Sequence, residues 1–159
     1  MIFKADLSAQ FITGGVPVDI SDYPFAVGVG KVDNGEYSHM GGGTIISETF
    51  IITAAHFPIL PTHVRAGANN IITLDDGAGQ SIAIKNYIIH PDFDNNNSTF
   101  GPSNDIALIE LEEPLQFNAK VQPIDMLEEN FEFSENQEIV ILGWSDICLL
   151  YTSPSPRDS

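Results

Sequence analysis

Phe50-Ile51-Ile52-Thr53-Ala54-Ala55-His56 is the stretch that decides the fold, and a second stretch, Asn104-Asp105-Ile106-Ala107-Leu108-Ile109-Glu110-Leu111, supports it further along. Each contains an apolar run rich in isoleucine, which favours a short β-strand. Each also sets one titratable side chain beside that run, His56 after the first and Asp105 before the second. Taken alone, such a histidine is more often a structural residue, and Asp105 could simply mark a strand start in a polar turn. The interpretation of both residues therefore depends on the segments around them.

The other apolar runs are short as well, and Gly, Asn, Asp and Pro separate them. The runs cover residues 24–30, 43–46, 50–54, 81–85, 87–89 and 106–111. This spacing argues for antiparallel strands in a small barrel or sandwich rather than for helices. With 43% hydrophobic side chains among 159 residues, the chain can bury a core, and we expect one compact all-β domain.

The charge of the chain excludes several classes of partner. The formal net charge is −16, and residues 104–138 carry ten acidic side chains against one basic side chain, Lys120. We interpret this segment as a solvated face. Nucleic acid and anionic membrane surfaces are not expected as partners, because phosphate binding needs basic patches. No apolar stretch approaches the roughly twenty residues that span a bilayer, so no membrane anchor is expected either.

Both opening stretches resemble the histidine and aspartate segments of the chymotrypsin/trypsin family of serine proteases. Further segments agree in family order: Ile12-Thr13-Gly14-Gly15, His39-Met40-Gly41-Gly42-Gly43-Thr44-Ile45-Ile46, Val64-Arg65-Ala66-Gly67, Ile88-Ile89-His90-Pro91-Asp92-Phe93, Val121-Gln122-Pro123-Ile124 and Gly143-Trp144. Any one match is weak, but the ordered series favours the catalytic interpretation of His56 and Asp105. The resemblance implies the N-terminal six-stranded antiparallel Greek-key barrel of the two-barrel trypsin-like fold, with the second barrel truncated.

The resemblance also implies a function and a set of site residues. His56 and Asp105 would be catalytic and would lie within hydrogen-bond reach at the barrel's edge, since an unpaired buried carboxylate costs several kcal/mol. Ile12 would be the activation N-terminus, freed by cleavage after Phe11. The chain contains no Gly-Asp-Ser-Gly-Gly-Pro stretch, so we expect a serine endopeptidase fragment without its nucleophile, which is inactive as it stands. Polypeptide substrates and protein protease inhibitors are the implied partners, and no cofactor is implied.

The same alignment divides the chain into four expected parts. We expect a propeptide remnant over residues 1–11, the N-terminal barrel over 12–123, and an acidic linker with the first strand of the second barrel, at 139–142, within 124–147. Residues 148–159 resemble one reading frame of an adapter used in preparing DNA sequencing libraries, so a non-native tail is expected; a natural tail rich in Ser and Pro is the alternative. Family members are usually exported, so a secreted protein is expected, although residues 1–5 do not make a signal peptide.

Two further features can be expected from the sequence. Family members commonly join two cysteines at the positions of Gly41 and Phe57, and a small residue opposite a large aromatic ring is expected to fill that space instead. Asn96 and Asn97 begin two overlapping N-glycosylation acceptors, Asn96-Asn97-Ser98 and Asn97-Ser98-Thr99.

No metal site is expected. Calcium-binding relatives place glutamates where this chain has Ala68 and Ala78. His39, His63 and His90 lack metal-ligand spacing, and we interpret them as structural or surface residues.

Three functional hypotheses follow. The first is the serine endopeptidase. The second is a catalytically inactive serine protease homologue that acts as a binding protein, and the downstream sequence would discriminate between these two. The third is a free-standing single-barrel binding module, which would leave the apolar run at 138–142 as a strand with an unpaired edge.

Overall fold

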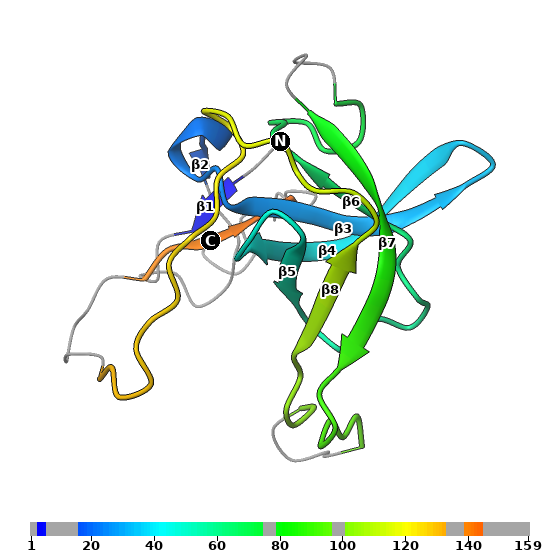
Figure 1. Cartoon of the computed structure of the whole chain (residues 1–159), viewed down its shortest axis with the longest axis vertical. Coiled ribbons are helices and arrows are strands. Elements are labelled where there is room, and N and C mark those ends of the chain that lie inside the picture. The colour runs from blue at the N-terminus through cyan, green and yellow to red at the C-terminus, as the bar shows by residue number, and fades with distance from the viewer. Residues whose placement is uncertain (1–2, 6–15, 75–78, 97–100, 133–138, 145–159) are drawn as a thin grey trace, which may run out of the picture.

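Six antiparallel strands close into a barrel in the computed structural model, which describes residues 3–5, 16–74, 79–96, 101–132 and 139–144 (Figure 1). The barrel strands are β3 (Ala26–Asp33), β4 (Glu36–Ile45), β5 (Phe50–Thr53), β6 (His63–Ala66), β7 (Gln80–Ile89) and β8 (Ala107–Leu111). Their spatial order is β3-β4-β5-β8-β7-β6, which closes the ring through β6 and β3. Because β6 lies on the other side of β3 from β4 and β5, the first four strands form a Greek key. The predicted all-β Greek-key barrel is confirmed.

The core of the barrel is built by alternate residues of each strand. In β5 and β8, Ile51 and Ile109 face each other in register and are fully buried. Val29 of β3 and Val64 of β6 pair in the same way on the opposite side. A period of two with one face inward is what a closed barrel requires, because every strand has one face toward the interior.

Residues at both ends of β3 explain its length and its continuous apolar run. At its end, Asn34 and Gly35 make a two-residue turn into β4 with φ angles of 49° and 84°. Positive φ at both central residues is the geometry of the type I′ hairpin, which matches the twist of the strands. At its start, Ala26 packs outside the barrel in a second cluster with Ile20, Tyr37 and others. The first five residues of the strand are therefore buried, and its last three are half-buried or exposed.

The strand boundaries differ from the sequence expectation in two places. β6 was not among the predicted apolar runs, because its sequence His-Val-Arg-Ala carries two polar side chains; only Val64 and Ala66 are buried. The runs 81–85 and 87–89 were predicted as separate strands but form one strand, β7. Asn86 interrupts the hydrophobicity there, and the register against β8 shifts between Ile84 and Asn86. The polar residue thus coincides with an irregularity in the pairing rather than with the end of a strand.

A small second sheet lies beside the barrel (Figure 1). Its order is β2-β1-β9, with β1 at Phe3–Ala5, β2 at Val16–Pro17 and β9 at Ile141–Gly143. A short 3₁₀ helix at Ile20–Asp22 follows β2. The strand expected at 139–142 is therefore present, displaced toward the C-terminus, and it has a partner: β1 pairs with it from the segment expected to be a propeptide remnant. Within the described residues, no helix is long and apolar enough to cross a membrane.

Candidate active site

His56 and Asp105 meet at one end of the pair formed by β5 and β8. Thr53, the last residue of β5, faces Ala107, the first residue of β8. Because the two strands are antiparallel, the residues that follow β5 and those that precede β8 emerge at the same edge of the barrel. The Nδ1 atom of His56 lies 2.6 Å from Oδ2 of Asp105. The hydrogen-bonded pair expected from the sequence is thus formed.

The backbone holds the other carboxylate oxygen of Asp105. Oδ1 accepts hydrogen bonds from the backbone N–H groups of Ala55 at 2.8 Å and of His56 at 3.0 Å. Asn104, just before the aspartate, has a φ of 51°, a left-handed conformation that asparagine adopts more readily than most residues. Its side-chain amide donates to the carbonyl of Asp92 at 2.8 Å. The carboxylate is therefore fixed in one orientation before any substrate binds.

The hydrogen bonds also keep Asp105 ionised. Burial disfavours the charged carboxylate, but the hydrogen bonds from the His56 ring and the Ala55 N–H outweigh burial and hold the pKa of Asp105 below its ordinary value. Asp105 precedes β8, as its place before the apolar run indicates, but its side chain is 26% exposed rather than buried. The His56 side chain is 51% exposed. With Nδ1 engaged, Nε2 is the ring nitrogen that can accept a proton from a reactant.

Phe57 packs where the two cysteines of many family members would meet. A Cβ atom added to Gly41 would lie 2.8 Å from Cε1 of the Phe57 ring, closer than real Cβ atoms come, and 3.0 Å from Cζ. The phenylalanine ring also packs against the barrel core. The structure therefore fits the expectation that an aromatic ring against a glycine fills this space.

Replacing Gly41 by alanine should accordingly destabilise the barrel. We expect a loss of about 1–3 kcal/mol, because the Phe57 ring must move out of a packed position. Gly42→Ala is the matched control in the same strand, since its Cβ would meet only the Val27 carbonyl, at 3.8 Å. That control should be neutral or slightly stabilising. Urea unfolding of both variants checks the difference, and equal midpoints would contradict the packing role of Phe57.

Three of the predicted site residues lie away from this pair or outside the described residues. Ile12 and Asn97 both lie outside the described residues. Asn96 is exposed, and its N–H donates to Oδ1 of Asp94 at 2.8 Å. The candidate active site therefore rests on His56 and Asp105 alone.

The remaining histidines have local partners. His39 packs between Tyr37 and Trp144, and burial lowers the pKa of His39. Nδ1 of His63 lies 2.9 Å from the Thr62 hydroxyl, and Nδ1 of His90 accepts a hydrogen bond from the N–H of Asp92. In the part of the chain that the structure describes, no three His, Cys, Asp or Glu side chains gather as a metal site would require.

Tyr87 is the residue near this site that sequence reasoning missed. It lies in β7, and its hydroxyl donates to the carbonyl of Ala54 at 2.6 Å. Tyr87 stands 33 residues after Ala54 in the sequence, and nothing in the sequence indicates that the two residues are in contact.

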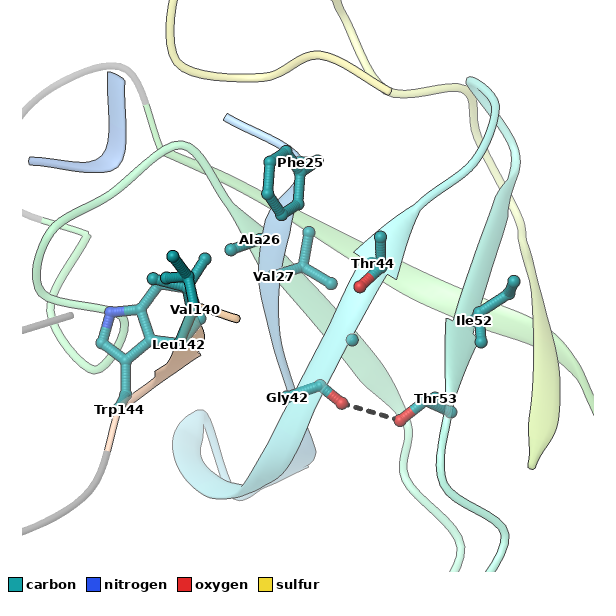
Figure 2. Close-up of a pocket in the computed structure, with 11 residues that line it drawn as sticks. Phe25, Ala26, Val27, Gly42, Thr44, Ile52, Thr53, Val140, Leu142 and Trp144 are labelled. Carbon is teal, nitrogen blue, oxygen red and sulfur yellow. Dashed lines mark hydrogen bonds between the residues drawn. The ribbon is translucent and has the colours of Figure 1, made fainter. Parts of the chain in front are cut away.

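A pocket of about 380 Å³ lies beside β5, between β3, β4, β5 and the segment that carries β9 (Figure 2). Its lining is largely apolar and includes Val140, Leu142 and Trp144 on the β9 side. The hydroxyl of Thr53, which also lines the pocket, donates to the carbonyl of Gly42 at 2.8 Å, as the dashed line in Figure 2 shows. With that hydroxyl already bonded, the pocket offers a mainly apolar surface close to where the His56 loop begins.

The chain is similar to several known proteins. A trypsin from Simulium vittatum is 31% identical over 90% of this chain and 56% of its own length. Trypsin V-A from Rattus norvegicus is 31% identical over 96% of this chain and 57% of its own length. A solved structure described as "Structure of GrC" superposes with a TM-score of 0.65 at 25% identity, over 77% of this chain and 52% of that one.

The chain thus spans little more than half the length of the proteins it matches. The model of the family described as Trypsin matches residues 12–151, which include every strand of the barrel together with His56 and Asp105. This match shows that the chain belongs to the trypsin-like serine protease family, and the barrel and the position of the His56–Asp105 pair are consistent with it.

Proposed function

We propose that this chain is the N-terminal part of a serine endopeptidase, and that His56 and Asp105 are two members of its Ser-His-Asp triad. The observation that carries the proposal is the contact of 2.6 Å between Nδ1 of His56 and Oδ2 of Asp105, with both backbone N–H donors on Oδ1. A histidine held through Nδ1 by an oriented carboxylate is the arrangement that prepares Nε2 to act as a general base.

The proposed reaction is acyl transfer from a peptide bond to water. A serine outside this chain would attack the carbonyl carbon, and Nε2 of His56 would take the hydroxyl proton and then give it to the leaving amine. Water would then attack the resulting acyl-serine ester, with Nε2 again taking a proton and returning it to the serine oxygen as the acid leaves. Asp105 would hold the ring and stabilise the imidazolium that forms. Since the chain holds neither this serine nor the oxyanion donors that the resemblance places in a second barrel, it should not hydrolyse peptides on its own.

The pocket beside β5 is the surface on which we expect the proposed second barrel to pack. One wall is the N-terminal barrel, and the other carries Val140, Leu142 and Trp144, from the part expected to start the second barrel. Ile139 and Ile141 nearby are 52% and 38% exposed. Apolar surface of this kind is typical of a face that another domain covers. We therefore propose that the second barrel packs across this pocket and brings its serine toward His56.

The family resemblance adds further proposals about the whole protein. It would be secreted, would act on polypeptide substrates and would be open to protein protease inhibitors. Cleavage after Phe11 would free the amine of Ile12, and Asn96 or Asn97 would carry glycans if the protein enters a secretory pathway. We propose that the chain has four parts: a propeptide remnant at 1–11, the N-terminal barrel at 12–123, an acidic linker with the first strand of the second barrel at 124–147, and a non-native tail at 148–159.

Labelling of the complete protein tests the proposed function. The transcript is sequenced past the codon for Ile147, and the full-length protein is expressed and treated so that Ile12 becomes the N-terminus. We expect covalent labelling by a fluorophosphonate, which reacts with activated serines, together with hydrolysis of peptide substrates. A full-length protein with another residue in place of the serine, no labelling and a specific binding partner would instead support the inactive homologue.

A further inference from the structure

One peptide unit beside the active-site pair is hydrogen-bonded at both of its ends. The carbonyl of Ala54 accepts from the Tyr87 hydroxyl at 2.6 Å. The N–H of Ala55, which belongs to the same peptide unit, donates to Oδ1 of Asp105 at 2.8 Å. Oδ2 of that carboxylate contacts Nδ1 of His56 at 2.6 Å. A continuous chain of hydrogen bonds therefore runs from Tyr87 through the 54–55 peptide and Asp105 to His56.

Because the peptide unit is planar, the hydrogen bonds at its two ends are mechanically coupled. In a trans peptide the C=O and N–H groups lie in one plane and point in opposite directions, so a bond that fixes the Ala54 carbonyl also fixes the direction of the Ala55 N–H. Hydrogen bonds in series polarise one another, so the Tyr87 hydroxyl also strengthens the bond at the other end of the unit. Both effects act on the orientation of the Asp105 carboxylate.

Packing holds Tyr87 in the position that this contact requires. In β7 it faces Ile109 of β8 in register. The Tyr87 ring packs against the Phe57 ring with centroids 6.4 Å apart, and Phe57 in turn lies beside the His56 ring at 5.8 Å. Burial, together with the negative charge of Asp105, raises the pKa of Tyr87. The hydroxyl thus keeps its proton, and its role as donor, throughout the neutral range.

We propose that Tyr87 is a positioning residue for the His56–Asp105 pair, acting through the peptide unit between Ala54 and Ala55. Its consequence for catalysis rests on the proposed protease function. Its consequence for the geometry of the pair belongs to this chain alone and can be measured without a nucleophile.

NMR spectroscopy of Tyr87→Phe in the full 159-residue chain tests the proposal. The variant keeps the ring and removes only the hydroxyl. We expect the Ala55 amide to exchange with solvent about fivefold faster, the change that one net hydrogen bond makes to a local opening equilibrium. We also expect the proton resonance of His56 Nδ1 to move upfield as the contact with Asp105 loosens. Core amides such as those of Val64 and Ile109 should exchange as in the parent chain.

Two further variants keep the test decisive. Tyr23→Phe makes the same chemical change at a half-buried tyrosine whose ring packs against Phe25, and it should alter neither readout. Phe57→Leu leaves the hydroxyl but removes the ring against which Tyr87 packs, so it should accelerate exchange at the Ala55 amide as Tyr87→Phe does. Only this readout is used for the variant, because the Phe57 ring also lies beside the His56 ring and its loss moves the His56 resonance directly. Phe57→Leu carries the test if Tyr87→Phe does not fold.

Unchanged Ala55 exchange and an unchanged His56 resonance in Tyr87→Phe would overturn the positioning role. So would an acceleration at Ala55 that the core amides share in equal proportion, because that result would show only a loss of overall stability. Neither readout requires peptide hydrolysis. Failure here therefore leaves the protease proposal standing, and failure of the protease proposal leaves this result intact.

Discussion

His56→Ala in the complete, activated protein is expected to lower kcat by about 10⁶-fold, the loss seen when a triad histidine is removed. In this structure the imidazole Nδ1 is engaged with Asp105, and the ring is half exposed, so Nε2 can reach a nucleophile that approaches from outside the barrel. Alanine offers no base in place of the imidazole. Peptide hydrolysis measured under saturating substrate gives the loss directly.

A matched histidine variant separates catalysis from folding. His63→Ala removes an imidazole whose Nδ1 contacts only the neighbouring Thr62 hydroxyl among the described residues, on β6 rather than beside β8. It should change kcat less than about twofold, since a substitution away from the site alters mainly stability, and that by about 0.5 kcal/mol or less. Equal losses in the two variants would contradict a catalytic role for His56.

The barrel could be predicted from the sequence because its strands alternate. Ile51 and Ile109 lie in runs whose hydrophobicity and β-branching indicate strands, and both prove to be central core residues. Strand boundaries were harder to predict. In β6, Val64 and Ala66 alone mark the buried face, while in β7 the interruption at Asn86 suggested an end where the structure has only a shift of register.

The small sheet could not be predicted from local sequence patterns. β1 pairs with β9 across almost the whole length of the chain, and no feature of Phe3–Ala5 selects that partner. Pairing between strands so distant in sequence depends on the tertiary fold, which brings Phe3–Ala5 and Ile141–Gly143 side by side. Propensity describes the strand but not its neighbour.

The candidate site, too, could be predicted only in part. Resemblance to a family led to His56 and Asp105, because the segments around them stand in family order. Periodicity and spacing alone left both residues ambiguous. Tyr87 could not be found by either route, since its role depends on a contact with the backbone carbonyl of Ala54, and a backbone acceptor leaves no mark on the sequence.

The second large effect is expected from Asp105→Asn, and the hydrogen bonds of the structure fix its direction. Two backbone N–H donors, from Ala55 and His56, face Oδ1. An asparagine must therefore keep its amide oxygen on that side, because an NH₂ group there would face two other donors. Its NH₂ group then faces Nδ1 of His56 and donates to it.

This reversal of donor and acceptor changes the tautomer of the imidazole. If Nδ1 accepts a hydrogen bond, the proton of the neutral ring must sit on Nε2, the nitrogen that should receive the serine proton. The ring can then no longer act as a base. We expect kcat of the complete protein to fall by about 10⁴-fold with little change in KM, since the substrate-binding surface is untouched.

The tautomer itself can be observed in the 159-residue chain before any activity is measured. In the parent chain, the ¹⁵N shifts of His56 should show a protonated Nδ1 in contact with Asp105; in Asp105→Asn they should show a protonated Nε2 and an unprotonated Nδ1. Asp125→Asn, which changes an exposed carboxylate beyond β8, is the control and should leave the His56 spectrum as it was. If the ring keeps its proton on Nδ1 opposite asparagine, then the backbone donors on Oδ1 do not dictate the orientation of residue 105, and the geometric basis for a triad in this chain is wrong.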